Sequence, residues 1–122
     1  MNFKDKVVIV TGGTRGIGLE VAKSFYEKEA NVIIFGSKKE SVDKTVEELS
    51  KDNILVEGYY PNLNNYQEVV ETIDKIYNKY KRIDVLINNA GISANKKIED
   101  TTSEEFMHIM DININVFFFF LV

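Results

Sequence analysis

The sequence predicts an α/β fold in which a doubly wound, mainly parallel sheet is covered by helices. Two observations lead to this prediction. Four short apolar runs alternate with longer segments in which apolar residues recur every three or four positions, and three of these runs are continuous. Continuous apolar runs are typical of strands buried on both faces, as in a parallel sheet. Strands that alternate with helices need right-handed crossovers, so the expected order is βαβαβαβα.

The four apolar runs are the expected strands. The third run is the weakest of them because Glu57 and Gly58 interrupt it. Pro61, the only proline of the chain, follows that run, where it interrupts no strand ladder. The expected strands are residues 7–10, 32–35, 54–60 and 85–87.

Apolar stripes at helical spacing fill the intervals between the strands. The third stripe is the clearest because acids and lysines stand opposite it. The stripes comprise Ile17, Val21, Ala22 and Phe25 in the first, Val42, Val46 and Leu49 in the second, and Tyr66, Val69, Val70, Ile73, Ile76, Tyr77 and Tyr80 in the third.

A fourth helix is expected to begin at Thr102. Its first turn reads Thr102-x-x-Glu105, a capping box in which hydroxyl and carboxylate bond to the free amides of the turn. The stripe that follows continues to Phe120. Residues 1–122 therefore form one domain, or part of one, which we expect to be truncated after this helix.

Composition limits the class of protein. Among 122 residues, 44% are apolar and 28% are charged, as in soluble globular domains. The net charge of −4 argues against nucleic acid. The apolar run at the end has seven residues, far below the roughly 20 that span a membrane. With no cysteine and no secretory signal, a cytoplasmic protein without a membrane or metal site is expected.

A glycine-rich turn follows the first strand and precedes the first helix. Its sequence, TGGTRGIG, spans residues 11–18. Glycine permits positive φ and close approach of a pyrophosphate, while the helix start directs free amides and a dipole at an anion. A P-loop is excluded because Gly18 is followed by Leu19 and Glu20, and the fingerprint G-x-G-x-x-G is absent. The alternative is a tight turn without a ligand.

The spacing T-G-x-x-x-G-x-G, with NNAG after the fourth strand, resembles the short-chain dehydrogenase/reductase family, whose fold is Rossmann-like. "RIDVLINNAG" and "MDIN" strengthen the resemblance, which covers essentially the whole chain. It implies that the chain is the dinucleotide-binding N-terminal part of one domain, and that Thr11 ties the glycine turn to the NNAG segment. The implied cofactor contacts are Thr11, Gly12, Thr14, Arg15, Gly16, Ile17, Gly18, Ser37, Lys38, Asn62, Leu63, Asn89, Ala90 and Gly91.

The end of the second strand indicates which cofactor is bound. NAD-binding folds place an acid there to accept hydrogen bonds from the ribose 2′-hydroxyl, and that acid repels a 2′-phosphate. Here Gly36 stands at that position, and Arg15, Ser37 and Lys38 can surround a phosphate. NADP(H) is therefore favoured over NAD(H). The alternative is that Lys38 and Lys39 are solvated charges at a helix start.

Two implied site residues depart from the family pattern or have a second interpretation. Asn62 replaces the family's usual aspartate after the third strand, and its amide oxygen can still accept a bond from adenine. Asn113 matches the helix asparagine that supports the proton relay, so it is the catalytic candidate of this chain. It also lies on the apolar stripe, where it could be an ordinary buried amide, and Val116 is bulkier than the family's usual residue.

The catalytic serine and the Tyr-x-x-x-Lys pair of the family are expected after the fourth helix and are absent here. The single Tyr-x-x-x-Lys match, Tyr77 to Lys81, is interpreted as a core tyrosine and a charge at a helix end. We therefore expect part of an NADP(H)-dependent oxidoreductase acting on a small carbonyl or alcohol, inactive alone and homo-oligomeric. The parent would resemble 3-oxoacyl-carrier-protein reductases or hydroxysteroid or sugar-alcohol dehydrogenases. The alternative is a non-catalytic nucleotide-binding or interaction module.

Overall fold

A four-stranded parallel sheet forms the centre of the protein. The computed structural model describes residues 2–50, 56–90 and 102–104. The strand order is β3-β2-β1-β4, and every pairing is parallel, with Ile9 opposite Ile33 and Leu86. The bounds are β1 Val7–Thr11, β2 Asn31–Phe35, β3 Val56–Tyr59 and β4 Val85–Ile87. The predicted parallel α/β sheet is confirmed.

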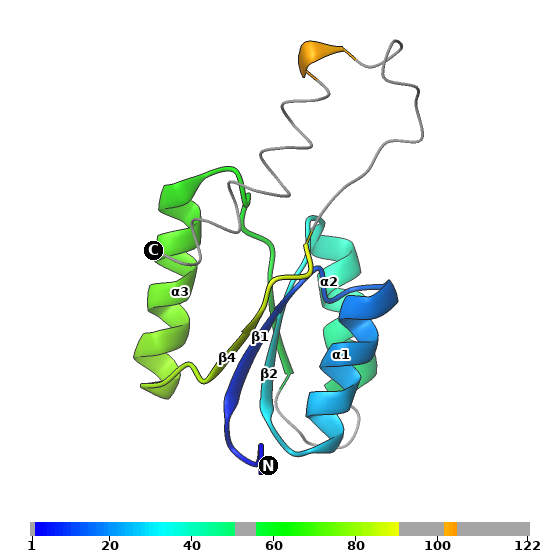
Figure 1. Ribbon diagram of the computed structural model, residues 1–122, viewed down its shortest axis with the longest axis vertical. Coiled ribbons are helices and arrows are strands. Elements are labelled where there is room, and N and C mark those ends of the chain that lie inside the picture. Colours follow the sequence, from blue (N-terminus) through cyan, green and yellow to red (C-terminus); the bar gives the residue numbers. More distant parts are fainter. Residues whose placement is uncertain (1, 51–55, 91–101, 105–122) are drawn as a thin grey trace.

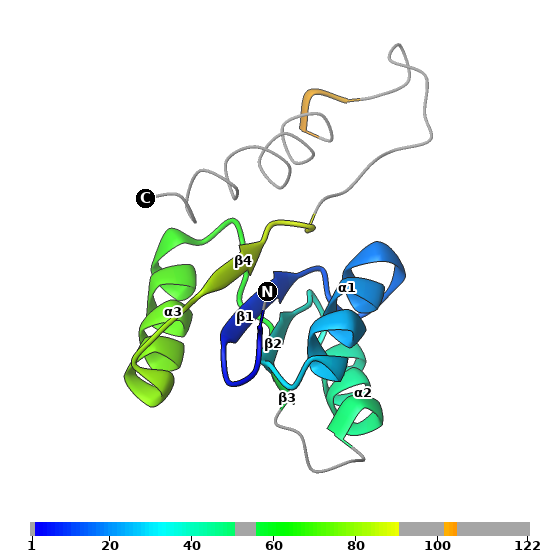
Figure 2. The same ribbon diagram turned by 60° about the horizontal axis from the view of Figure 1, so that its bottom comes forward.

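Helices cover both faces of this sheet. Helices α1 (Gly16–Glu27) and α2 (Lys39–Leu49) lie side by side on one face, and α3 (Tyr66–Tyr80) covers the other (Figure 1, Figure 2). The fold is therefore doubly wound, as predicted. Of the expected fourth helix, Ser103 and Glu104 are helical and Thr102 directly precedes them, while the part from residue 105 onward lies outside the described residues. None of the helices in the described ranges is long and apolar enough to cross a membrane.

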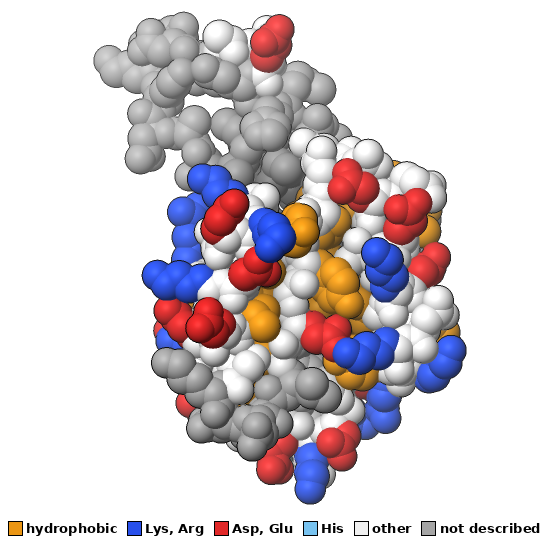
Figure 3. Space-filling view, turned by 180° about the vertical axis from the view of Figure 1, so that it is seen from behind, with side chains coloured by type: hydrophobic (Ala, Val, Ile, Leu, Met, Phe, Trp, Pro, Cys, Tyr) orange, Lys and Arg blue, Asp and Glu red, His pale blue; other side chains and the backbone are white. Residues whose placement is uncertain are grey.

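The sheet has a buried apolar layer on each face because strand residues alternate between its two sides. Val8, Val10 and Ile34 pack toward α1 and α2. Ile9 and Phe35 pack toward α3, where the Phe35 ring meets the Tyr59 ring edge-on. Apart from Tyr59, which is half-buried, these side chains are almost fully buried. Each such burial stabilises the fold by about 1.5 to 3 kcal/mol. Figure 3 shows the side of the molecule that faces away from the viewer in Figure 1. On it, hydrophobic side chains are exposed in the middle of the surface, with charged side chains on either side.

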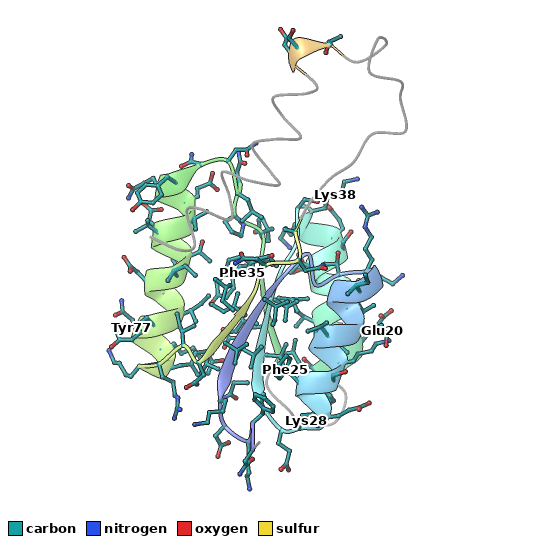
Figure 4. The ribbon with its side chains drawn as sticks, viewed as in Figure 1. Glu20, Phe25, Lys28, Phe35, Lys38 and Tyr77 are labelled. Carbon is teal, nitrogen blue, oxygen red and sulfur yellow. The ribbon has the colours of Figure 1, made fainter. Side chains whose placement is uncertain are left out.

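Three residues of the predicted apolar stripes are exposed. Ile17 is 77% exposed, Tyr66 49% and Tyr77 52%, so the assignment of Tyr77 to the core is wrong. Two of these residues lie away from the centre of the buried stripe of their helix. Tyr77 lies about 80° around α3 from the buried Val69, and Ile17 lies about 140° around α1 from the buried Ala22. Figure 4 shows Tyr77 pointing away from the sheet.

The α3 face is held by paired polar groups. Glu57 of β3 accepts hydrogen bonds from the hydroxyls of Tyr59 (3.1 Å) and Tyr80 (2.8 Å), and it also pairs with Lys79. Its side chain is only 16% exposed. Burial alone would raise the pKa of Glu57, but the bonds from Lys79, Tyr80 and Tyr59 outweigh it and lower that pKa. Asn65 caps α3 by accepting from the Glu68 amide at 3.2 Å.

Candidate functional site

The candidate site lies at the carboxyl edge of the sheet, the upper edge in Figure 1. Strands β1, β2 and β4 end there at Thr11, Phe35 and Ile87, and helices α1 and α2 begin there. In open α/β sheets, ligands bind at this edge, beyond the carboxyl ends of the strands. The glycine turn predicted from sequence, the end of β2 and the segment after β4 are therefore brought together by the topology.

The glycine turn between β1 and α1 depends on residues without a side chain. Gly12 has a φ of +65° and Gly16 a φ of +57°, in the left-handed region that favours glycine. A Cβ on Gly18 would overlap the carbonyl oxygen of Gly12 and crowd the Asn89 amide. This close approach lets the first turn of α1 lie directly against the end of β1.

Thr11 and Asn89 join the glycine turn to the segment after β4. The Thr11 hydroxyl accepts from the backbone amides of Asn89 (3.0 Å) and Ala90 (2.9 Å), and it donates to the Ile87 carbonyl at 3.3 Å. The Asn89 side-chain amide donates to the Gly12 carbonyl at 3.2 Å. The predicted link from Thr11 to the NNAG segment is confirmed. The bond from Asn89 to Gly12 was not predicted, because no residue pattern indicates a contact between two turns that are distant in the sequence.

The start of α1 offers amides to a ligand. Its N-cap, Arg15, makes no side-chain capping bond, and the first turn contains no acid. Arg15 and Ile17 are both exposed. Unsatisfied amides and the positive end of the helix dipole favour an anion at such a terminus. The chemistry of the turn therefore fits a phosphate group.

The end of β2 has no acid and little room for one. A Cβ on Gly36 would lie 2.7 Å from Cγ2 of Val42 and 2.8 Å from Cγ2 of Thr14. Ser37 and Lys38 follow as exposed residues, and Lys38 lies at the upper end of α2 (Figure 4). Among the residues that the structure describes, neither Lys38 nor Arg15 forms an ion pair. Two unpaired cations therefore stand near a strand end without an acid.

Polar atoms of the loop after β3 form hydrogen bonds within the loop and to the start of α3. The side-chain oxygen of Asn62 accepts from the backbone amide of Asn64 at 3.0 Å, and the backbone amide of Asn62 donates to the Glu68 carboxylate at 3.4 Å. Leu63 is half-buried and packs on the apolar layer beneath α3. A carbonyl oxygen has a second lone pair, so Asn62 can still accept another hydrogen bond.

An open pocket that the sequence analysis missed lies between the glycine turn and α2. Its volume is about 260 Å³. The sequence contained a signal for it, because the α2 residues that line it follow the spacing i, i+3, i+4, i+7 and share one side of the helix. The lining residues are Thr14, Arg15, Ser41, Lys44, Thr45 and Glu48.

Two residues that were predicted as site residues, Gly91 and Asn113, lie outside the described residues.

Residues 6–121 match the family model described as short chain dehydrogenase. The chain is 40% identical over 120 residues to a 3alpha-hydroxysteroid dehydrogenase of Mediterraneibacter gnavus, covering 97% of this chain and 48% of that protein. It is 33% identical over 118 residues to an NADP-dependent mannitol dehydrogenase of Hypocrea jecorina, covering 93% and 44%. A short chain dehydrogenase from Bacillus anthracis superposes with a TM-score of 0.91 at 31% identity, covering 96% and 48%. The chain thus spans about half the length of these proteins.

Proposed function

Because the chain belongs to the short-chain dehydrogenase family, we propose that its glycine turn holds the pyrophosphate of a nicotinamide dinucleotide. The start of α1 is the observation that carries this proposal, since its N-cap makes no side-chain bond and its first turn contains no acid. Gly12, Gly16 and Gly18 keep the approach to these amides free of side chains. Exposed Ile17 covers the ligand from the side of the helix.

The nicotinamide end of the cofactor is assigned to the segment after β4. Asn89, Ala90 and Gly91 form the wall beside the nicotinamide ribose in this proposal. The bonds that the Asn89 and Ala90 amides donate to Thr11, and the bond that the Asn89 side chain donates to Gly12, support it, because they hold this wall and the pyrophosphate turn as one unit. The adenine is assigned to the loop at Asn62 and Leu63, where the free lone pair of the Asn62 oxygen can accept from the purine amino group.

NADP(H) is the proposed cofactor, in preference to NAD(H). The crowding of Gly36 by Thr14 and Val42 leaves little space for the acid that would bind a free ribose 2′-hydroxyl. Arg15 and Lys38, with no ion pair in the described part of the chain, supply positive charge for a 2′-phosphate, and Ser37 supplies a hydroxyl. The NADP dependence named for the mannitol dehydrogenase is consistent with this choice.

The whole protein is proposed to be a cytoplasmic homo-oligomer that oxidises or reduces a small alcohol or carbonyl substrate. The nicotinamide supplies or accepts the hydride, and Asn113 supports the proton relay. The family's Tyr-x-x-x-Lys pair is not found at its expected place in these 122 residues. We therefore propose that these residues bind the cofactor without turning over a substrate.

Nucleotide titration tests the binding proposal. NADPH and NADH are titrated by fluorescence against the wild-type chain, the double variant R15M/K38M and the control K28M, whose lysine lies at the far end of α1. We expect the wild-type chain to prefer NADPH. Loss of two charge-assisted contacts should weaken NADPH binding at least about tenfold. NADH binding and the K28M variant should show no comparable change.

Two results would overturn parts of this proposal. Equal affinity of the wild-type chain for the two nucleotides would rule out the NADP(H) preference. Oxidation of NADPH by the chain with a panel of ketones, above that of a Gly12→Val control, would contradict the claim that these residues bind without turnover. Light scattering of the whole protein tests the proposed oligomer, which a monomer would contradict.

A further inference from the structure

The pocket between the glycine turn and α2 contains polar side chains, Ser41 and Lys44, that are not among the proposed cofactor contacts. Thr14 and Arg15 line it from the turn, and Ser41 and Lys44 line it from α2. Helix α2 begins at the same edge of the sheet as α1 and runs beside it (Figure 2). The pocket is therefore continuous with the site proposed for the dinucleotide, through Thr14 and Arg15.

The cations of the pocket are not neutralised by carboxylates. Within the described ranges, neither Arg15 nor Lys44 forms an ion pair, although Glu48 lies one helical turn beyond Lys44. Lysines at other positions of the same two helices do pair, since Lys39 contacts Asp43 on α2. Lys23 likewise contacts Glu20 on α1. The positive charge that faces the pocket is therefore available to an anion from solution.

The hydroxyls of the pocket complete an anion-binding set. The Thr45 hydroxyl donates to the Ser41 carbonyl at 2.9 Å, so its proton is already used. The hydroxyls of Thr14 and Ser41 make no hydrogen bond to any residue of the described part, and both can donate. Glu48 repels an anion at its own end of the pocket, so the favourable position lies near Arg15 and Ser41.

We propose that this pocket receives the 2′-phosphate of NADP(H) and that Lys44 is a specificity-determining residue that contacts it. This inference rests on the proposed function, because it adds a residue to the same cofactor site. Arg15 provides a planar fork for the phosphate oxygens, and Lys44 provides a compact charge on a flexible stem that adapts to the remaining oxygen. The preference for NADP(H) then depends on α2 as well as on the end of β2.

The experiment uses two nucleotides that differ only in the 2′-phosphate. Adenosine 2′,5′-bisphosphate and adenosine 5′-monophosphate are titrated calorimetrically against the wild-type chain, K44M, K44R and the control K39M. Methionine keeps the apolar stem and removes the charge. Loss of one charge-assisted contact should weaken binding of the bisphosphate by about tenfold in K44M. The monophosphate affinity should not change, K44R should retain most of the preference, and K39M should match the wild type.

The outcomes separate this inference from the proposed function. If the wild type prefers the bisphosphate but K44M keeps that preference, the role of Lys44 is refuted while the proposed cofactor stands. A K44M variant that loses affinity for both nucleotides equally would also refute a contact with the 2′-phosphate. If the wild type binds neither nucleotide, or binds both equally, the NADP(H) site itself is refuted and the assignment of Lys44 is refuted with it. Circular dichroism verifies that each variant is folded.

Discussion

The two faces of the sheet differ in how far their polar groups are paired within the protein. On the α3 face, Glu57 receives three donors and Asn65 caps the helix. On the α1/α2 face, neither helix has a side-chain cap, and the cations around the pocket lack carboxylate partners in the described part. A polar group paired within the protein contributes to stability, whereas an unpaired one can bind a ligand. We infer that the paired groups on the α3 face stabilise the fold, and that the unpaired groups between the glycine turn and α2 serve the proposed cofactor.

The largest effect is expected from a side chain in the glycine turn. Gly18→Ala places a methyl group against the backbone of Gly12, which cannot move without displacing β1. We expect about 2 to 3 kcal/mol of destabilisation from this overpacking. Loss of nucleotide binding should accompany it because the amides of α1 are displaced. Urea unfolding and NADPH titration measure the two effects.

Gly16→Ala is the matched control for this variant. A Cβ on Gly16 would meet no atom within 4 Å, so only its positive φ is unfavourable. The cost should be about 1 kcal/mol. If the two variants were equally destabilised, close packing of the turn would not be the reason for glycine at position 18.

A smaller effect is expected on the opposite face. Glu57→Ala leaves the hydroxyls of Tyr59 and Tyr80 without their acceptor and should cost about 1 to 3 kcal/mol. Nucleotide affinity should stay within twofold of the wild type, because Glu57, Tyr59 and Tyr80 are not among the proposed cofactor contacts. A fall in affinity comparable to that of Gly18→Ala would contradict the division of roles between the two faces.

Lowering the pH should remove most of the stabilisation that Glu57 gives to the folded protein. The folded-state pKa of Glu57 is lowered, so its charged form stabilises the protein at a pH above the ordinary pKa of a glutamate. That contribution is lost as the pH falls through the lowered value. Stability curves of the wild type and Glu57→Gln should therefore approach each other in acid. A difference that stayed constant down to the lowest pH would show that the charge of Glu57 does not contribute.

The smallest effect is expected when a single hydroxyl is removed. Two buried threonines, Thr11 and Thr45, can be compared in this way. Thr11→Val leaves the amides of Asn89 and Ala90 without their acceptor and should cost about 1 to 2 kcal/mol. Thr45→Val removes a bond to the carbonyl of its own helix and should be nearly neutral, since that bond competes with helical structure. Thermal unfolding of the two variants gives the comparison. Equal losses would argue that Thr11 does not join the two halves of the site.

Much of the fold followed from local patterns. Strands β1, β2 and β4 were predicted to within one residue at each end, because continuous apolar runs mark strands buried on both faces. The glycine turn and the link through Thr11 were also anticipated. The exposure of Tyr77 was not predicted. Periodicity indicates that a residue lies near an apolar stripe, but it does not indicate how far the sheet extends beneath the helix. The interpretation of Asn113 remains a prediction.

The order of strands and helices and the glycine turn could be predicted from the residues alone, since these features depend on local periodicity and on backbone freedom at single positions. The contacts between residues far apart in the chain follow only from the packing of the whole fold. The bond from Asn89 to Gly12 joins positions that parallel pairing of β1 and β4 brings into contact. Lys44 and Arg15 line one pocket because α1 and α2 pack on the same face of the sheet. The spacing of residues along the chain does not predict these contacts, because they form only when the crossover connections pack the helices against the whole sheet.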